Sequence, residues 1–108
     1  MKEIKQNQNL VRINSLLSEL YDILDNQEAK SAVQTAYNTI NKPDKVTEKY
    51  KEVPDAIDKM KRDFSRISLV RKKHFTREQE EIVSKLTFFT NQCFRKGFEG
   101  LVYASLWF

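Results

Sequence analysis

Apolar residues in the first part of the chain recur with the spacing of an α-helix. The positions that form this stripe are Leu10, Ile13, Leu16, Leu17, Leu20, Ile23 and Leu24. Steps of three and four residues place these side chains on one face of a helix, and most polar side chains between them fall on the other face. The pattern predicts an amphipathic helix over residues 6–25. Asp25 and Asn26 indicate its end, because short polar side chains compete for backbone hydrogen bonds.

A second stripe, made of smaller residues, predicts a helix over residues 27–41. Its members are Ala29, Ala32, Val33, Ala36, Tyr37 and Ile40. Asn26 is expected to cap the N-terminus of this helix. Pro43 is expected to end it, since a proline disfavours helical backbone at the residue before it. The small side chains predict that a neighbouring helix approaches closely.

Residues 44–53 are ambiguous in the pattern. Val46, Tyr50 and Val53 keep helical spacing, but Pro54 interrupts the run. Proline is favourable at the first position of a helix and costly in its interior. We therefore expect a loop with one helical turn here, followed by a third helix over residues 54–73 that starts at Pro54. Its stripe consists of Ile57, Met60, Phe64, Ile67 and Val70.

A fourth helix is expected over residues 77–96. Thr76, with Gln79 three residues later, predicts a capping box at its start, and Gly97 is expected to follow its last turn. Its stripe consists of Ile82, Val83, Leu86, Phe89 and Cys93. Four helices joined by short links predict one all-α domain over residues 1–108. The expected fold is an antiparallel up-down four-helix bundle with an apolar C-terminal tail over residues 98–108.

The composition supports a small helical domain and argues against several kinds of site. The 108 residues include only two glycines and two prolines, too few for the turns of a sheet protein or for a glycine-rich phosphate loop. One cysteine excludes an intramolecular disulfide and a cysteine-rich zinc site. Cys93 is expected to be a buried thiol of the core, and His74 to cap or stack at the turn between the last two helices. We therefore expect no catalytic residue, no metal and no cofactor.

No export signal or membrane span is expected. Residues 1–9 are polar and lack the apolar core of a signal peptide. The longest apolar run, residues 101–108, is far shorter than the roughly 20 residues of a spanning helix. The sequence therefore predicts a cytoplasmic protein.

Positive charge is concentrated in the second half of the chain. The net charge is +4, with 8 basic and 8 acidic residues in 1–53 and 11 against 7 in 54–108. Part of this charge is balanced by pairs four residues apart, such as Lys59 with Asp63. The cluster at the corner between the third and fourth helices consists of Arg71, Lys72, Lys73 and Arg77. It is consistent with a solvated surface, with attraction to the anionic inner face of a membrane, or with nucleic-acid binding.

The tail is unusually apolar. Ser105 is the only non-apolar side chain from Leu101 to Phe108. Such a segment is expected to fold back onto the helices or to meet a partner, since an exposed apolar patch is a liability in a monomer. The tail residues that we expect to contact a partner are Leu101, Tyr103, Leu106, Trp107 and Phe108.

The corner at residues 69–78, Leu-Val-Arg-Lys-Lys-His-Phe-Thr-Arg-Glu, resembles the same corner in immunity proteins of the pediocin-like (class IIa) bacteriocins. In both, a Leu-Val pair leads through basic residues to His-Phe-Thr and an acidic helix start. The resemblance covers residues 54–97 best, and over 1–53 it extends only to architecture. Length, basic character and a tail with tryptophan also agree.

The resemblance implies a four-helix protein without enzyme activity that protects a producer cell from its own pore-forming peptide. Such proteins act from the cytoplasm on the mannose phosphotransferase components in the membrane once these have bound the bacteriocin. On this interpretation, the basic corner with His74 and the tail would bind the partner. The alternative is a small basic helical protein that binds nucleic acid or acts as a regulator, although acidic residues interleave with its basic ones. The sequence does not predict an oligomeric state.

Overall fold

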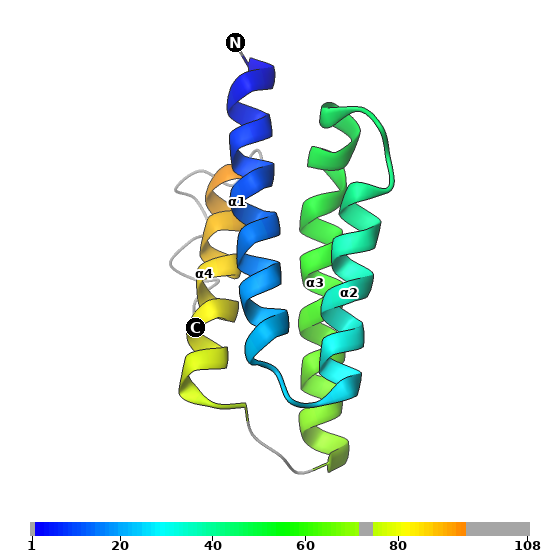
Figure 1. Cartoon of the computed structure of the whole chain (residues 1–108), viewed down its shortest axis with the longest axis vertical. Helices are drawn as coiled ribbons and strands as arrows, with labels where there is room; N and C mark the ends of the chain where they lie inside the picture. Colours follow the sequence, from blue (N-terminus) through cyan, green and yellow to red (C-terminus); the bar gives the residue numbers. More distant parts are fainter. Residues whose placement is uncertain (1, 72–74, 95–108) are drawn as a thin grey trace.

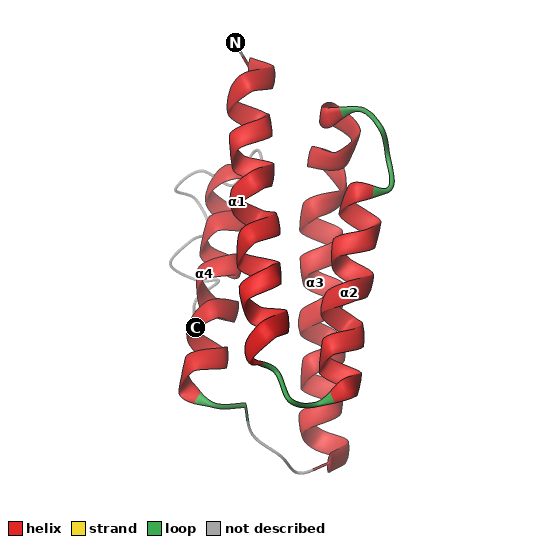
Figure 2. Ribbon diagram, viewed as in Figure 1, coloured by secondary structure: helices red, strands yellow, loops and turns green. Residues whose placement is uncertain are grey.

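The structure of the chain, a computed structural model, describes residues 2–71 and 75–94. Its regular elements are α1 (Lys2–Ile23), α2 (Gln27–Asn41), α3 (Val46–Arg71) and α4 (Arg77–Cys93). No strand occurs in these two described ranges. Over these ranges the prediction of an all-α fold with four helices is therefore confirmed (Figure 2).

The four helices lie side by side along the longest axis of the molecule (Figure 1). The most extensive contact joins α2 to α3, followed by that of α1 with α4. Helix α1 also contacts α2 and α3, whereas α3 and α4 share the smallest interface. Among the described residues α2 and α4 do not touch, so they occupy opposite corners of the assembly.

Helix capping follows the sequence closely. The side chain of Asn26 accepts a hydrogen bond from the backbone N–H of Ala29 at 3.0 Å, and α2 spans the predicted range. Thr76 and Gln79 form the predicted capping box at the start of α4. These features are encoded locally, because a cap needs only residues within one turn of each other.

The outer ends of the helices differ from the prediction. Helix α1 covers 2–23 rather than 6–25, and Leu24 is buried just outside it. Helix α4 ends at Cys93, and Phe94 forms a buried turn whose N–H donates to the carbonyl of Thr90 at 2.9 Å. Helix α3 is described to Arg71. The predictions for residues 72–73, for residues 95–96 with Gly97, and for the tail over 98–108 lie outside the described residues.

The prediction of a loop over residues 44–53 is wrong, because α3 begins at Val46 and runs through Pro54. A proline inside a helix removes one backbone hydrogen bond and crowds the preceding turn. Here the cost is offset by burial. Val53 is completely buried, and Val46 and Tyr50 pack against the core. A loop over these residues would leave those three side chains without their contacts.

The core consists mainly of the predicted stripes, but Tyr37, expected in the stripe of α2, is 36% exposed, and three other predicted members are only partly buried: Ile23, Val83 and Phe89. Val70 was expected to continue the stripe of α3 but is 74% exposed, as is its neighbour Leu69 at 79%. Cys93 was expected in the core but is only partly buried. Both residues lie at the last turn of a helix, where no neighbouring described helix covers them fully. The residues of the core are Leu10, Ile13, Leu16, Leu17, Leu20, Leu24, Ala29, Ala32, Val33, Ala36, Ile40, Val53, Ala56, Ile57, Met60, Phe64, Ile67, Ile82, Leu86 and Phe94.

Thr90 is an unsatisfied polar residue of this core. It is fully buried, and its Oγ1 has no hydrogen-bond partner in the described part of the chain. Since a buried hydroxyl without a partner loses its hydration and gains nothing in return, Thr90→Val should raise the free energy of unfolding by about 1 kcal/mol. Urea unfolding followed by circular dichroism measures this change.

Thr87 provides the matched control on the same helix. Its Oγ1 donates to the carbonyl of Val83 at 2.9 Å, so Thr87→Val removes a hydrogen bond that exists and should give no such gain. Equal effects of the two substitutions, or a loss of stability in Thr90→Val, would contradict the interpretation of Thr90 as unsatisfied.

Candidate functional site

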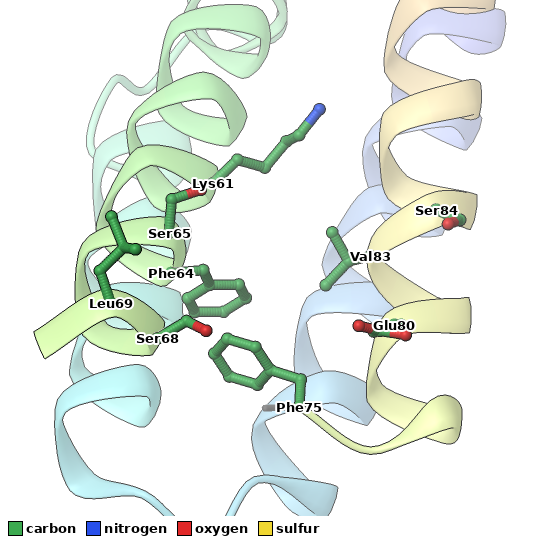
Figure 3. Close-up of a pocket in the computed structure, with 9 residues that line it drawn as sticks. All are labelled: Lys61, Phe64, Ser65, Ser68, Leu69, Phe75, Glu80, Val83 and Ser84. Carbon is green, nitrogen blue, oxygen red and sulfur yellow. The ribbon is translucent and has the colours of Figure 1, made fainter. Parts of the chain in front are cut away.

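A groove with a volume of about 670 Å³ lies between α3 and α4 (Figure 3). We call it the α3–α4 groove. Its lining residues are Lys61, Phe64, Ser65, Ser68 and Leu69 from α3, Phe75 just before α4, and Glu80, Val83 and Ser84 from α4. The lining is mainly apolar, and Leu69 at its edge is 79% exposed.

Two phenylalanines form the floor of the groove. The rings of Phe64 and Phe75 lie with their centroids 5.0 Å apart at an angle of 38° (Figure 3). A residue directly before an N-cap often packs against the fourth residue of its own helix. Here that fourth residue is the charged Glu80, and Phe75 packs across to α3 instead. The aromatic pair therefore joins α3 to the residue just before α4 at the floor of the groove.

Short side chains on both walls keep the groove open. Ser65 and Ser68 occupy positions of α3 where larger apolar residues would fill the space toward α4. Ser84 is a similarly short side chain on the α4 wall. Residues three and four apart share one helix face, which puts Ser65, Ser68 and Leu69 in one row. Val83 points from α4 toward α3 across the gap (Figure 3).

Helix α4 is held firmly on either side of the groove. At its start, Nε2 of the buried Gln79 donates to the carbonyl of Ile23 at 3.0 Å. At its end, the hydroxyl of Tyr50 donates to the carbonyl of Cys93 and accepts from Nδ2 of Asn9. The ring of Tyr50 also stacks on that of Phe94, with centroids 4.2 Å apart. Contacts at both ends of α4 therefore set its position relative to α1 and α3, and with it the width of the groove.

Charge around the groove is mixed. Lys61 and Glu80 stand on opposite walls. Further along α3, Asp63 accepts hydrogen bonds from Lys59 at 3.2 Å, the predicted pair, and from Arg66 at 3.4 Å. Partial burial raises the pKa of the Asp63 carboxyl, but the two cations outweigh it and leave the pKa below its ordinary value. Part of the positive charge of α3 is thus neutralised within the helix.

Only part of the predicted partner-binding set can be placed. Arg77 is in the first turn of α4, with its side chain 95% exposed and its Nε 4.0 Å from Oε1 of Glu81. Arg71 is the last residue of α3, and its side chain lies outside the description. Lys72, Lys73 and His74 also lie outside the described residues, as do Leu101, Tyr103, Leu106, Trp107 and Phe108.

The one thiol of the chain, that of Cys93, lies among the described residues. Burial raises the pKa of the Cys93 thiol, while Lys5 lowers it to a smaller extent. A protonated thiol is a weak nucleophile. Three or more potential metal-ligating side chains do not gather anywhere in residues 2–71 and 75–94. None of the helices in those ranges combines the length and apolarity needed to cross a membrane.

The sequence indicates the corner at residues 69–78 but not the groove beside it. The sequence feature that points to the groove is the pair of serines at positions 65 and 68. They are short side chains on the same helix face as Leu69, in a helix whose other side chains are mostly long. Nothing in the sequence shows which helix that face meets, so a hollow could not be distinguished from a solvated surface. The structure adds that α4 is the facing helix.

Comparisons with known proteins do not assign the chain to a family. No protein-family model matches it, no curated protein matches it, and no solved structure matches it.

Proposed function

We propose that this protein is an immunity protein of the pediocin-like bacteriocin type. The supporting observation is the exposure of the apolar residues at the start of the corner that resembles this family. Leu69 and Val70, which open the resembling corner, are 79% and 74% exposed at the end of α3. Packing explains apolar residues in a core, but adjacent exposed apolar residues on a charged helix are typical of binding surfaces. Of the two, Val70 does not line the α3–α4 groove, so the resemblance includes an apolar residue that the described fold leaves available to a partner.

The proposed fold is an antiparallel up-down four-helix bundle. Figure 1 supports it, since the link 24–26, the end of α3 and the start of α4 lie at one end of the molecule and the link 42–45 lies at the other. The absence of contact between α2 and α4 among the described residues also fits a bundle in which each helix has two close neighbours.

The proposed mechanism is binding without catalysis. The protein would act from the cytoplasm, partly at the inner face of the membrane, on mannose phosphotransferase components that have bound the bacteriocin. Val70 and the exposed Arg77 belong to the surface that would meet this complex, and they supply it with an apolar side chain and a cation. Such a combination suits a membrane protein surrounded by anionic lipid.

Expression of the chain in bacteriocin-sensitive cells tests the proposal. We expect protection against one or a few peptides in a panel of purified pediocin-like bacteriocins. Val70→Asp should abolish this protection, because it places a carboxylate in an apolar contact without disturbing the core. The readout is the peptide concentration that inhibits growth, with and without each variant.

Val11→Asp is the matched control. Val11 is 58% exposed on α1, away from the corner, and its substitution should leave protection intact. Failure of every peptide in the panel to distinguish cells with and without the protein would refute the proposed function. Equal loss in both variants would refute the assignment of the corner as the binding surface.

A further inference from the structure

The α3–α4 groove is an apolar surface that needs a cover. Phe64, Phe75 and Val83 line it, and Leu69 at its edge is more exposed than any other large apolar residue of the described core and surface. An apolar patch of this kind is a binding site or a cause of aggregation. A volume of about 670 Å³ lies in the range of pockets that enclose small ligands or a few side chains.

The chain itself contains a segment of matching chemistry. Residues 101–108 are apolar apart from Ser105, and they include two aromatic residues in succession, Trp107 and Phe108. They have no charged side chain, so the opposing charges of Lys61 and Glu80 on the groove walls neither attract nor repel their side chains strongly. Aromatic side chains bury large areas and pack well against other rings, so Trp107 and Phe108 suit the Phe64–Phe75 floor of the groove.

The length of the connection fits this placement. The last described residue, Phe94, lies about 16 Å along α4 from Val83, at 1.5 Å per residue. The six residues 95–100 span about 20 Å when extended. A chain that turns back at the end of α4 therefore brings residue 101 to the groove, and the remaining apolar residues can run along it.

We propose that the segment 101–108 docks in the α3–α4 groove of its own chain and covers Phe64, Phe75, Val83 and Leu69. A short link gives the segment an effective concentration in the millimolar range, so its own groove competes well against a second copy. The inference concerns the isolated protein and stands whether or not the proposed function is correct.

Trp107 provides a direct readout, because it is the only tryptophan of the chain. In the folded protein its fluorescence should be shifted to shorter wavelength and quenched several-fold less by acrylamide than in the same chain unfolded in urea. Leu69→Asp should move both values toward those of the unfolded chain, because a carboxylate at the groove edge disfavours apolar contact.

Val70→Asp is the matched control for this experiment. Val70 is the next residue and is 74% exposed, but it does not line the groove. The same substitution there should leave the fluorescence of Trp107 unchanged. Both variants change exposed side chains, and circular dichroism verifies that the helices remain folded.

Three results would overturn the proposal. The first is a tryptophan in the folded protein that is as accessible to acrylamide as in urea. The second is an equal response to the substitutions at Leu69 and Val70. The third is protection of Trp107 that disappears on dilution, which would assign the groove to the segment of a second copy.

Disulfide trapping gives an independent measurement in a Cys93→Ser background. Ser65→Cys on the groove wall, combined with Ser105→Cys, should form an intramolecular crosslink under mild oxidation. Ser31→Cys with Ser105→Cys is the control pair, because Ser31 is exposed on α2, which does not contact α4 in the described residues. Equal crosslinking of the two pairs would show a segment without a preferred position and would overturn the proposal.

Discussion

Gln79→Ala is expected to lower the free energy of unfolding by about 3 kcal/mol. The side chain of Gln79 is buried and joins two elements at once. Its Oε1 accepts from the backbone N–H of Thr76 at 2.9 Å, and its Nε2 donates to the carbonyl of Ile23 at 3.0 Å. Alanine removes both hydrogen bonds and leaves two backbone groups without those partners. Urea unfolding followed by circular dichroism measures the loss.

Gln79→Glu separates the two hydrogen bonds. A carboxylate still accepts from Thr76 but cannot donate to the carbonyl of Ile23, which it then faces with negative charge. Burial without a cationic partner raises the pKa of such a carboxyl in the folded state. Stability relative to the unvaried chain should therefore be recovered below the unfolded pKa of about 4.3 and lost as the pH rises through the folded pKa.

Gln92→Ala is the control for the capping contact, since Gln92 is exposed near the other end of α4. It should change the free energy of unfolding by less than about 0.5 kcal/mol. A loss of that small size in Gln79→Ala would mean that water replaces both hydrogen bonds. The hydrogen bond from Gln79 to the carbonyl of Ile23, which joins α4 to the end of α1, would then contribute little to stability.

Ala36→Leu is expected to cost about 2 kcal/mol of stability, because it overfills the closest helix interface. Ala32 and Ala36 of α2 line the same narrow hollow as Ala56 and Met60 of α3. Ala36 is 3% exposed, and beside the facing side chains of α3 only a hollow of about 120 Å³ is open to the added carbon atoms. They must displace α3 or adopt an unfavourable rotamer. The midpoint of urea unfolding should fall accordingly.

Ser31→Leu on the exposed side of α2 tests whether the effect comes from the interface. The serine side chain faces solvent, so leucine there should leave stability within about 0.5 kcal/mol of the original chain. A similar loss of stability in both variants would show that leucine destabilises helix α2 itself rather than its interface with α3. An unchanged stability in Ala36→Leu would show that the α2–α3 interface adapts to larger residues.

The sequence predicts those features correctly whose cause is local. The caps at Asn26 and Thr76 follow from a side-chain oxygen within reach of the next turn. The stripes of α1 and α2 follow from helical spacing, and their central residues are buried as expected. For the candidate site, the sequence predicts a basic corner at residues 69–78. Arg77 is the basic residue of that corner whose side chain the structure describes, and it is 95% exposed, while its role in binding a partner stays a prediction.

Prediction from the sequence failed where the outcome depends on a distant partner. Pro54 favours a helix start when only local rules are considered, and α3 nevertheless continues through it because Val53 is completely buried. Val70 keeps the spacing of its stripe, but the stripe extends beyond the helices that cover it, and the residue is exposed. Neither result can be obtained from one helix alone.

The amino-acid sequence by itself determined the helical class, the caps and the residues that face inward, because spacing and side-chain chemistry act within a few turns. The tertiary structure decided how far α3 extends and where the surface is hollow. The α3–α4 groove exists because Ser65 and Ser68 face α4 across the smallest helix interface, while Gln79 and Tyr50 fix α4 on either side. Those facing pairs are separated in sequence, and only folding brings them together.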